Sequence, residues 1–350
     1  MERGTLMVRA DAGPEMGTGH VMRCVALAQS WCDSGGRAIF GLAHSTPAID
    51  DLLRAEQIEI VPIDGVPGSR EDALQVVHIA QDWNVDWLVA DGYQFGEVYQ
   101  KQLQSARPLL TIDDNGLLES YPSDLVVNQN AHAREAMYAQ RSPATKLLLG
   151  PSYALLRDEF VAYRDCVREI PERGSRLLLT MGGSDAGNFT PRILPALAEL
   201  PVDDLEIRVA VGGSATNADE VEAIAARFGE RVAVQRNARN MAELMAWADL
   251  AIAGAGTTCW EMCSLGLPAL LVVVAENQRF IAEKLARIGA AENAGCADGI
   301  DCHALAQRCR ELLASRERRL ALSQNARIVV DGRGRERVLE MMKCGDEMCA

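Results

Sequence analysis

The sequence predicts an α/β protein built from two doubly wound, Rossmann-like domains that face a cleft. Short apolar runs alternate with amphipathic stretches along almost the whole chain, which is the pattern of βα units around a parallel sheet. The length of 350 residues suits about two domains. Each half also opens with a strand that runs into a glycine-rich turn, and in such sheets ligands bind at the carboxyl ends of the strands.

The first half, residues 1–155, forms the expected N-terminal domain. Its helices are expected to begin near His20, Pro47, Arg70 and Phe95. The apolar runs predict strands at Thr5–Ala10, Ala38–Ala43, Glu59–Ile63, Trp87–Ala90, Leu109–Ile112, Leu125–Asn128 and Leu147–Gly150.

A charged, amphipathic stretch then predicts a linker helix over residues 156–174, which Pro171 and Gly174 terminate. Residues 175–295 form the second domain, and residues 296–350 form a C-terminal segment with one or two exposed helices. The strands expected in the second domain are Arg176–Thr180, Glu206–Val211, Arg231–Val234, Leu250–Ala253 and Pro268–Val274. The helices expected there are Asn188–Leu200, Asp219–Phe228, Met241–Trp247, Thr257–Leu265 and Arg279–Ile288.

Composition and charge exclude several classes of protein. Hydrophobic residues make up 48% and charged residues 24%, as in ordinary globular chains. The net charge of −14 argues against a nucleic-acid partner. The longest apolar run, Pro268–Ala275, is far shorter than the roughly 20 residues that span a bilayer, and Met1–Asp11 lacks the apolar core of a signal peptide. We therefore expect a cytoplasmic protein without a membrane partner.

The ten cysteines do not have the spacing of a metal site. Cys259 and Cys263 lie four residues apart on one expected helix, and none of the ten is separated from another by two residues as in a zinc knuckle. We expect small buried thiols that stay reduced, and neither a metal nor another cofactor.

The first glycine turn contains Gly17 and Gly19 and is followed by His20 at the start of a helix. Glycines let the backbone approach a ligand closely, and a helix N-terminus favours negative charge. The turn is not a dinucleotide fingerprint, because Met22 stands where the third glycine would be. Because the helix dipole disfavours an imidazolium, we expect His20 to be neutral and able to accept a proton.

Two further turns follow expected strands of the second domain. Neither has the Gly-Lys-Ser/Thr ending of a P-loop. Together they predict a site for a ligand that carries a diphosphate, held by two helix N-termini, with Glu261 accepting the hydroxyls of a ribose. The residues assigned to this nucleotide site are Gly182, Gly183, Ser184, Gly254, Gly256, Thr257, Thr258, Glu261 and Gln278.

These motifs give the chain a specific resemblance. The second domain resembles the nucleotide-binding half of the B-type glycosyltransferase fold, which includes the UDP-GlcNAc transferase of peptidoglycan synthesis. From about residue 5 to about residue 290 the chain resembles the UDP-2,4-diacetamido-2,4,6-trideoxy-β-L-altropyranose hydrolases of pseudaminic acid biosynthesis. The stretches that carry this resemblance are Met16–Arg23, Ala90–Tyr93, Thr111–Asp114, Val127–Asn130, Gly150–Phe160 and Glu276–Gln278.

The resemblance implies hydrolysis of a UDP-sugar at the anomeric carbon, with His20 as the base that activates water. It assigns Tyr93 and Asn277 to catalysis as well. Gly92 stands where the family has a histidine, so no role is carried over to that position. The residues assigned to sugar binding are Gly17, Gly19, Asp91, Asp113, Asp114, Asn130, Tyr153 and Arg157.

Three alternatives remain open from the sequence. A glycosyltransferase on the same fold would pass the sugar to an acceptor, although no basic amphipathic stretch indicates a lipid acceptor. An epimerase would return an isomer, and a binding module would need no histidine at the first turn. The sequence also leaves the oligomeric state open, a monomer included.

Overall fold

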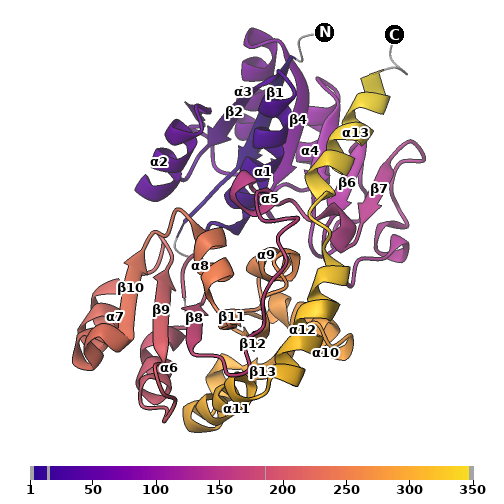
Figure 1. The fold of residues 1–350 in the computed structure, drawn as a ribbon. Coiled ribbons are helices and arrows are strands. Elements are labelled where there is room, and N and C mark those ends of the chain that lie inside the picture. The colour runs from indigo at the N-terminus through magenta and orange to yellow at the C-terminus, as the bar shows by residue number, and fades with distance from the viewer. Residues whose placement is uncertain (1–3, 14–15, 186, 347–350) are drawn as a thin grey trace. The chain divides into compact units, whose positions relative to one another are not determined.

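The chain folds into two α/β units. The computed structural model describes residues 4–13, 16–185 and 187–346. Unit 1 contains the described residues up to Asp158 and those from Gly332 onward, and unit 2 runs from Glu159 to Asp331 (Figure 1). Each unit is built around one parallel sheet, so the two doubly wound, Rossmann-like domains predicted from the sequence are confirmed.

Unit 1 has a seven-stranded sheet with the order β3-β2-β1-β4-β5-β6-β7. Its strands are β1 (Thr5–Ala10), β2 (Arg37–Leu42), β3 (Glu59–Pro62), β4 (Val85–Asp91), β5 (Leu109–Ile112), β6 (Leu125–Asn128) and β7 (Lys146–Leu149). Its helices are α1 (Gly19–Asp33), α2 (Pro47–Ala55), α3 (Arg70–Asp82), α4 (Glu97–Gln104) and α13 (Gly334–Asp346). The order reverses between β1 and β4, and such a switch point is where ligands bind in open α/β sheets.

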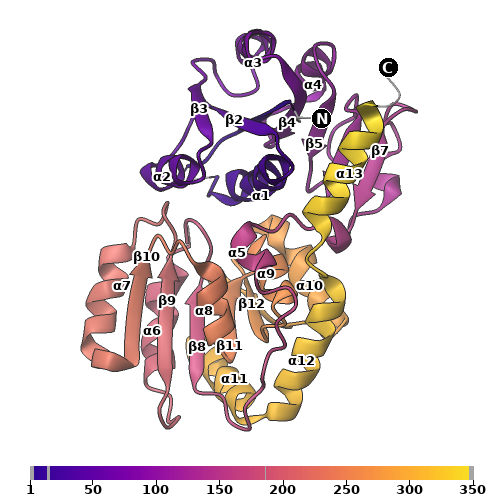
Figure 2. The same cartoon turned by 45° about the horizontal axis from the view of Figure 1, so that its top comes forward.

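Both faces of this sheet are covered by helices, so every position of the central strand β1 is buried. Leu6 and Val8 of β1 pack into one core cluster together with residues of α1 and α13. Met7 points to the other face and packs with residues of α3 and α4. Figure 2 shows α1 and α2 on one side of the sheet and α3 and α4 on the other.

Unit 2 has a six-stranded sheet with the order β10-β9-β8-β11-β12-β13, and its switch point lies between β8 and β11. Its strands are β8 (Arg176–Thr180), β9 (Glu206–Val211), β10 (Val232–Arg236), β11 (Leu250–Gly254), β12 (Ala269–Val273) and β13 (Glu292–Cys296). Its helices are α6 (Phe189–Ala198), α7 (Ala218–Ala225), α8 (Met241–Trp247), α9 (Thr258–Ser264), α10 (Arg279–Arg287), α11 (Cys302–Ala314) and α12 (Arg316–Val329).

The C-terminal part differs from the expectation of one or two exposed helices. Over its described residues this segment forms the helices α11, α12 and α13, and each has a buried face. Helices α11 and α12 pack on the core of unit 2, whereas α13 contributes Val338, Leu339 and Met342 to the core of unit 1. In the described ranges, no helix combines the length and the apolar character that crossing a membrane requires.

The linker differs too, because the expected helix over residues 156–174 is a single turn, α5 (Asp158–Val161). After it, backbone carbonyls accept hydrogen bonds from arginines of α12 instead of from the next helical turn. Arg327 donates to the carbonyl of Arg164 at 2.7 Å, and Arg316 donates to that of Ile170 at 3.0 Å. These side chains bind the linker to unit 2.

Arg168 of the linker binds the ends of two helices. Its guanidinium donates to the carbonyls of Met245 and Ala248 at the end of α8, both at 2.6 Å, and to that of Leu265 after α9 at 3.0 Å. Burial lowers the pKa of Arg168 to about 10. A cation at helix C-termini is favourable, and these carbonyls have no next turn to bond to.

Replacing Arg168 by alanine should destabilise unit 2 by about 3 kcal/mol, because three buried carbonyls lose a charged donor. Unfolding in urea followed by circular dichroism measures this loss. The matched control is Arg173→Ala, at an exposed arginine five positions along the same linker. Equal stability of the two variants would contradict the capping role of Arg168.

Candidate active site

The switch point of unit 1 brings His20 to Asp91. Asp91 is the last residue of β4 and lies opposite Ala10 of β1 in the parallel register. His20 is the second residue of α1, the helix that follows β1. The Nδ1 atom of His20 lies 2.7 Å from Oδ1 of Asp91, and both side chains are buried. The two residues come from neighbouring strand ends, as a ligand site in this fold requires.

Arg23 connects this pair to a second carboxylate. It lies one turn after His20 on α1, and its guanidinium forks onto Asp91, with Nε 2.6 Å from Oδ2 and one terminal nitrogen 2.7 Å from Oδ1. The other terminal nitrogen donates to Oδ1 of Asp114 at 2.8 Å. We call His20, Arg23, Asp91 and Asp114 the histidine cluster.

Residues from the next strand ends surround Asp114. The amide of Asn130, which follows β6, donates to Oδ1 of Asp114 at 2.7 Å. The hydroxyl of Tyr93 lies 3.4 Å from Oδ2 of Asp114, and its ring contacts the ring of His20 edge to face with centroids 4.9 Å apart. Tyr93 is 54% exposed, so it is a cluster neighbour that a ligand can reach.

The charges of the histidine cluster decide its protonation. Burial alone would raise the pKa of Asp91, but the guanidinium of Arg23 and the hydrogen-bonded ring of His20 outweigh burial and hold that pKa well below its usual value. Burial also opposes the charged form of Asp114, and Arg23 again lowers its pKa. Both carboxyl groups are therefore ionised at neutral pH.

An ionised Asp91 fixes the tautomer of His20. A carboxylate has no hydrogen to donate, so the contact of 2.7 Å requires the hydrogen to lie on Nδ1 of His20. The lone pair of the neutral ring is then on Nε2, the nitrogen that can accept a proton. The structure thus adds a carboxylate contact to the position of His20 at the start of α1.

Other residues assigned to the sugar lie in structural contacts. The carboxylate of Asp113 accepts from the backbone of Asn115 and Gly116 and from the hydroxyl of Tyr121, so it closes the turn after β5. Tyr153 is half-buried against the core of unit 1, and Arg157 is buried. Asp91 itself is fully buried and contacts the protein.

The first glycine turn has the backbone that the sequence suggested. Gly17 has a φ of 76°, a conformation that favours glycine. Its backbone forms a pair of hydrogen bonds with Gly13, which closes the loop before α1. Gly19 is the first residue of α1 and directly precedes His20.

In unit 2 the glycine turns meet at the carboxyl ends of β8, β11 and β12. A side chain at Gly254 would approach the carbonyl of Met181, at the end of β8, to 3.3 Å. One at Gly256 would lie 3.5 Å from the amide nitrogen of Gln278, whose oxygen accepts from the backbone of Val274. The structure thus brings the second and third turns together with Gln278.

The remaining residues assigned to the nucleotide lie on this same edge. Thr257, Thr258 and Glu261 are partly exposed at the start of α9. Asn277, which was assigned to catalysis, is exposed in the short 3-10 helix that follows β12. Gly182 has a φ of 82°, and the carbonyl of Gly183 accepts from the backbone of Ser214; Ser184 follows it in the turn.

At the N-terminus of α6, two backbone N–H groups already donate to a side chain of the protein. The carboxylate of Asp185 accepts from the backbone of Phe189 at 2.9 Å and of Thr190 at 3.0 Å. Asn217 donates to the same carboxylate at 2.7 Å. A carboxylate that already binds these donors repels a second anion.

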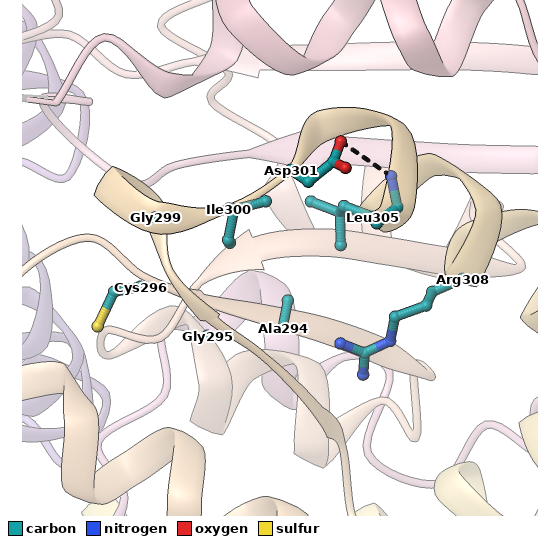
Figure 3. A pocket seen from close by; sticks show the side chains of 9 residues that line it. Ala294, Gly295, Cys296, Gly299, Ile300, Asp301, Leu305 and Arg308 are labelled. Atoms are coloured by element: carbon teal, nitrogen blue, oxygen red, sulfur yellow. Dashed lines mark hydrogen bonds between the residues drawn. The ribbon is translucent and has the colours of Figure 1, made fainter.

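A pocket elsewhere in unit 2 is separate from these residues. It lies between β13 and the first turns of α11, with Ile300 and Leu305 side by side on one wall (Figure 3). Its polar groups are already used, because Asp301 accepts from the backbone of Ala304 and Arg308 binds Glu292. The pocket contains no residue assigned to the sugar or the nucleotide.

Sequence reasoning missed two residues of this site. Arg23 belongs to the first glycine motif and lies three residues after His20, the spacing that puts two side chains on one face of a helix. That spacing could have indicated a shared partner. Asp185 follows the Gly-Gly-Ser turn and precedes a helix, which is the signature of a capping residue.

One family model matches part of the chain. Residues 177–335 match the glycosyltransferase family 28 C-terminal domain, a range that covers most of unit 2 and the start of α13. The match accounts for less than half of the chain.

Three curated relatives are distant. The chain is 25% identical over 282 residues to the uncharacterized protein MJ1062 of Methanocaldococcus jannaschii, covering 78% of this chain and 56% of that protein, so it spans little more than half of that relative. It is 24% identical over 339 residues to the spore coat polysaccharide biosynthesis protein SpsG of Bacillus subtilis, covering 95% of this chain and 96% of that protein. It is also 24% identical over 287 residues to the UDP-2,4-diacetamido-2,4,6-trideoxy-β-L-altropyranose hydrolase of Campylobacter jejuni, covering 81% and 97%.

Solved structures share the fold at low identity. MurG of Acinetobacter baumannii superposes with a TM-score of 0.65 at 18% identity, covering 97% of this chain and 99% of that one. The UDP-GlcNAc 2-epimerase of Neisseria meningitidis superposes with a TM-score of 0.65 at 13% identity, covering 97% and 99%. Together, the comparisons support an enzyme that processes nucleotide sugars on the two-domain fold of the B-type glycosyltransferases.

Proposed function

We propose that this protein is a hydrolase that cleaves a UDP-linked 2,4-diacetamido-2,4,6-trideoxyhexose at the anomeric carbon, for pseudaminic acid biosynthesis. The observation that carries the proposal is the contact of 2.7 Å between Nδ1 of His20 and the ionised Asp91, because it leaves Nε2 as a base. The similarity to the Campylobacter jejuni hydrolase along 81% of the chain supports the choice of substrate.

The chemistry needs a base and a site for the departing UDP. Nε2 of His20 takes a proton from water as the water oxygen bonds to the anomeric carbon. The bond from that carbon to the phosphate oxygen breaks, and its electron pair leaves with UDP. The proton on His20 then returns to solvent, so the products are the free sugar and UDP.

We assign the two parts of the substrate to the two units. In unit 1, Tyr93 is the exposed neighbour of His20, and Asn130 donates to Asp114 of the histidine cluster. In unit 2, the turn from Gly254 to Thr258 offers backbone N–H groups and two threonine hydroxyls to the diphosphate. Glu261, one turn into α9, accepts hydrogen bonds from the ribose hydroxyls. Asn277 and Gln278, in the 3-10 helix after β12, lie at the same edge of the sheet.

A glycosyltransferase is the second candidate, and the match of residues 177–335 to the family 28 domain favours it. In a transferase, the backbone N–H groups of the turn from Gly254 to Thr258 and the carboxylate of Glu261 would bind the UDP-sugar donor in the same way. The difference lies in the nucleophile: a transferase uses an acceptor hydroxyl where the hydrolase uses water.

Incubating the purified protein with the UDP-sugar, in the absence of any acceptor, separates these candidates. The hydrolase should release UDP in a stoichiometric amount, and in ¹⁸O-labelled water the label should enter the sugar and not the phosphate. Release of UDP only after an acceptor is added would establish a transferase. Recovery of an isomer without free UDP would establish an epimerase.

Replacing His20 by asparagine should lower kcat about 10²- to 10⁴-fold, because the base is lost, while the affinity for UDP stays as in the wild type. Coupled detection of UDP release gives kcat, and calorimetry gives the affinity. His78→Asn, at an exposed histidine of α3, is the matched control. A His20→Asn variant with normal kcat would remove His20 from the mechanism.

Replacing Glu261 by glutamine should weaken UDP binding by about tenfold or more, because hydrogen bonds to a charged acceptor are stronger than those to an amide. Titration calorimetry with UDP measures this change. Glu283→Gln, at an exposed glutamate of α10, should bind UDP normally. Unchanged affinity of the Glu261 variant would place the ribose elsewhere.

A further inference from the structure

Arg23 has no role in the proposed reaction, yet it occupies the centre of the histidine cluster. Its side chain is 97% buried and donates to both carboxylates of the cluster. One of its terminal nitrogens also lies 3.2 Å from Nδ1 of His20. A buried guanidinium that touches a base and both of its neighbouring carboxylates is placed to control that base.

The charges of the cluster balance only when His20 is protonated. Asp91 and Asp114 carry two negative charges and Arg23 carries one positive charge, so the cluster with a neutral ring has a net charge of about −1. An imidazolium at His20 brings this sum to zero. Buried charges are stable when they are paired, and a proton received by His20 would complete the pairing of charges within the cluster.

Three uncharged side chains also contact the carboxylates of the cluster. The thiol of Cys24 lies 3.5 Å from Oδ2 of Asp91, and the amide of Asn130 and the hydroxyl of Tyr93 contact Asp114. His132, on the loop after β6, lies near Asp114, where burial lowers its pKa. Arg23 is therefore the cation in direct contact with the His20–Asp91 pair among the described residues.

We propose that Arg23 is a positioning residue: it holds Asp91 in one orientation, fixes the hydrogen of His20 on Nδ1, and keeps that hydrogen on the ring when Nε2 takes up a proton. Without the guanidinium, Asp91 would be free to rotate or to take the Nδ1 hydrogen itself. The inference rests on the proposed function for its kinetic consequences. Its structural consequence, the tautomer, does not depend on any reaction.

The test has a readout in the ligand-free protein. Nitrogen-15 NMR of the wild type should show the Nδ1–H tautomer for His20, and Arg23→Gln should show a mixture of the two tautomers. A wild-type ring with its hydrogen on Nε2 would overturn the proposal, even if the protein proved to be a hydrolase. Conversely, a protein that fails to release UDP would refute the proposed function and leave the NMR result intact.

The kinetic test uses charge changes of opposite sign. Arg23→Gln removes a positive charge beside His20 and favours the imidazolium, so the acid limb of the kcat/KM profile should move to higher pH. Asp91→Asn removes a negative charge, so the limb should move to lower pH. Both variants should lower kcat about 10- to 100-fold through loss of orientation. Shifts in the same direction would contradict a role through His20.

Two further variants complete the design. Arg23→Lys keeps the positive charge but loses the two-point contact of the guanidinium with Asp91. The acid limb of its kcat/KM profile should therefore lie at the wild-type pH, while its kcat should be lower than that of the wild type. The double variant Arg23→Gln with Asp114→Asn keeps the net charge of the cluster and replaces the single variant if that one does not fold. Its acid limb in the kcat/KM profile should lie at the wild-type pH, and its NMR spectrum should still show both tautomers of His20. Arg54→Gln, at an exposed arginine of α2, is the control. A double variant with a single Nδ1–H tautomer and normal kcat would overturn the proposal.

Discussion

The fork between Arg23 and Asp91 is the contact on which the site in unit 1 depends. It joins α1, which follows the central strand β1, to the end of β4, the strand at which the sheet order reverses. Breaking a buried ion pair by removing one partner costs roughly 3–5 kcal/mol, because the other charge stays buried without compensation. The same contact keeps Asp91 ionised, and through Asp91 it sets the tautomer of His20. The contact between Arg23 and Asp91 therefore both stabilises the fold of unit 1 and determines which nitrogen of His20 carries the hydrogen.

The two units reach their sites by the same topological rule. In each, the strand order reverses beside the first strand, and the turn after that strand lies next to the end of the fourth strand of the unit. Asp91 lies opposite Ala10 in unit 1, and Gly254 lies against Met181 in unit 2. The chemistry placed at these points differs. Unit 1 has ionised side chains around a histidine, whereas unit 2 has glycine and threonine that leave backbone groups accessible.

The sequence predicted the fold well because both sheets are parallel and buried. Five of the expected strands, among them Thr5–Ala10 and Arg176–Thr180, have the bounds that the structure shows, since strands covered on both faces contain short, mostly apolar runs. Strand β13 was missed because it is a half-buried edge strand that contains Glu292, Asn293 and Gly295. The linker helix was predicted from a local pattern, but hydrogen bonds from distant arginines of α12 determine that segment.

The site was only partly predictable for a similar reason. Glycine turns and His20 are local signals, and the structure places them at the strand ends as expected. The partner of His20 is 71 residues away in the sequence, so its pairing required the sheet order. The same holds for Asp185, whose short-range pattern fits a helix cap as well as a ligand site until its two backbone donors are seen.

Helix α13 gives unit 1 a core that is assembled from both ends of the described chain. Val338, Leu339 and Met342 pack into the same cluster as α1, while the intervening residues 159–331 form unit 2. On the ribosome, unit 2 is therefore complete before unit 1 has received its last helix. Until that helix emerges, the apolar face of α1 that it covers stays open to solvent and to chaperones, so unit 1 depends on late synthesis for its final packing.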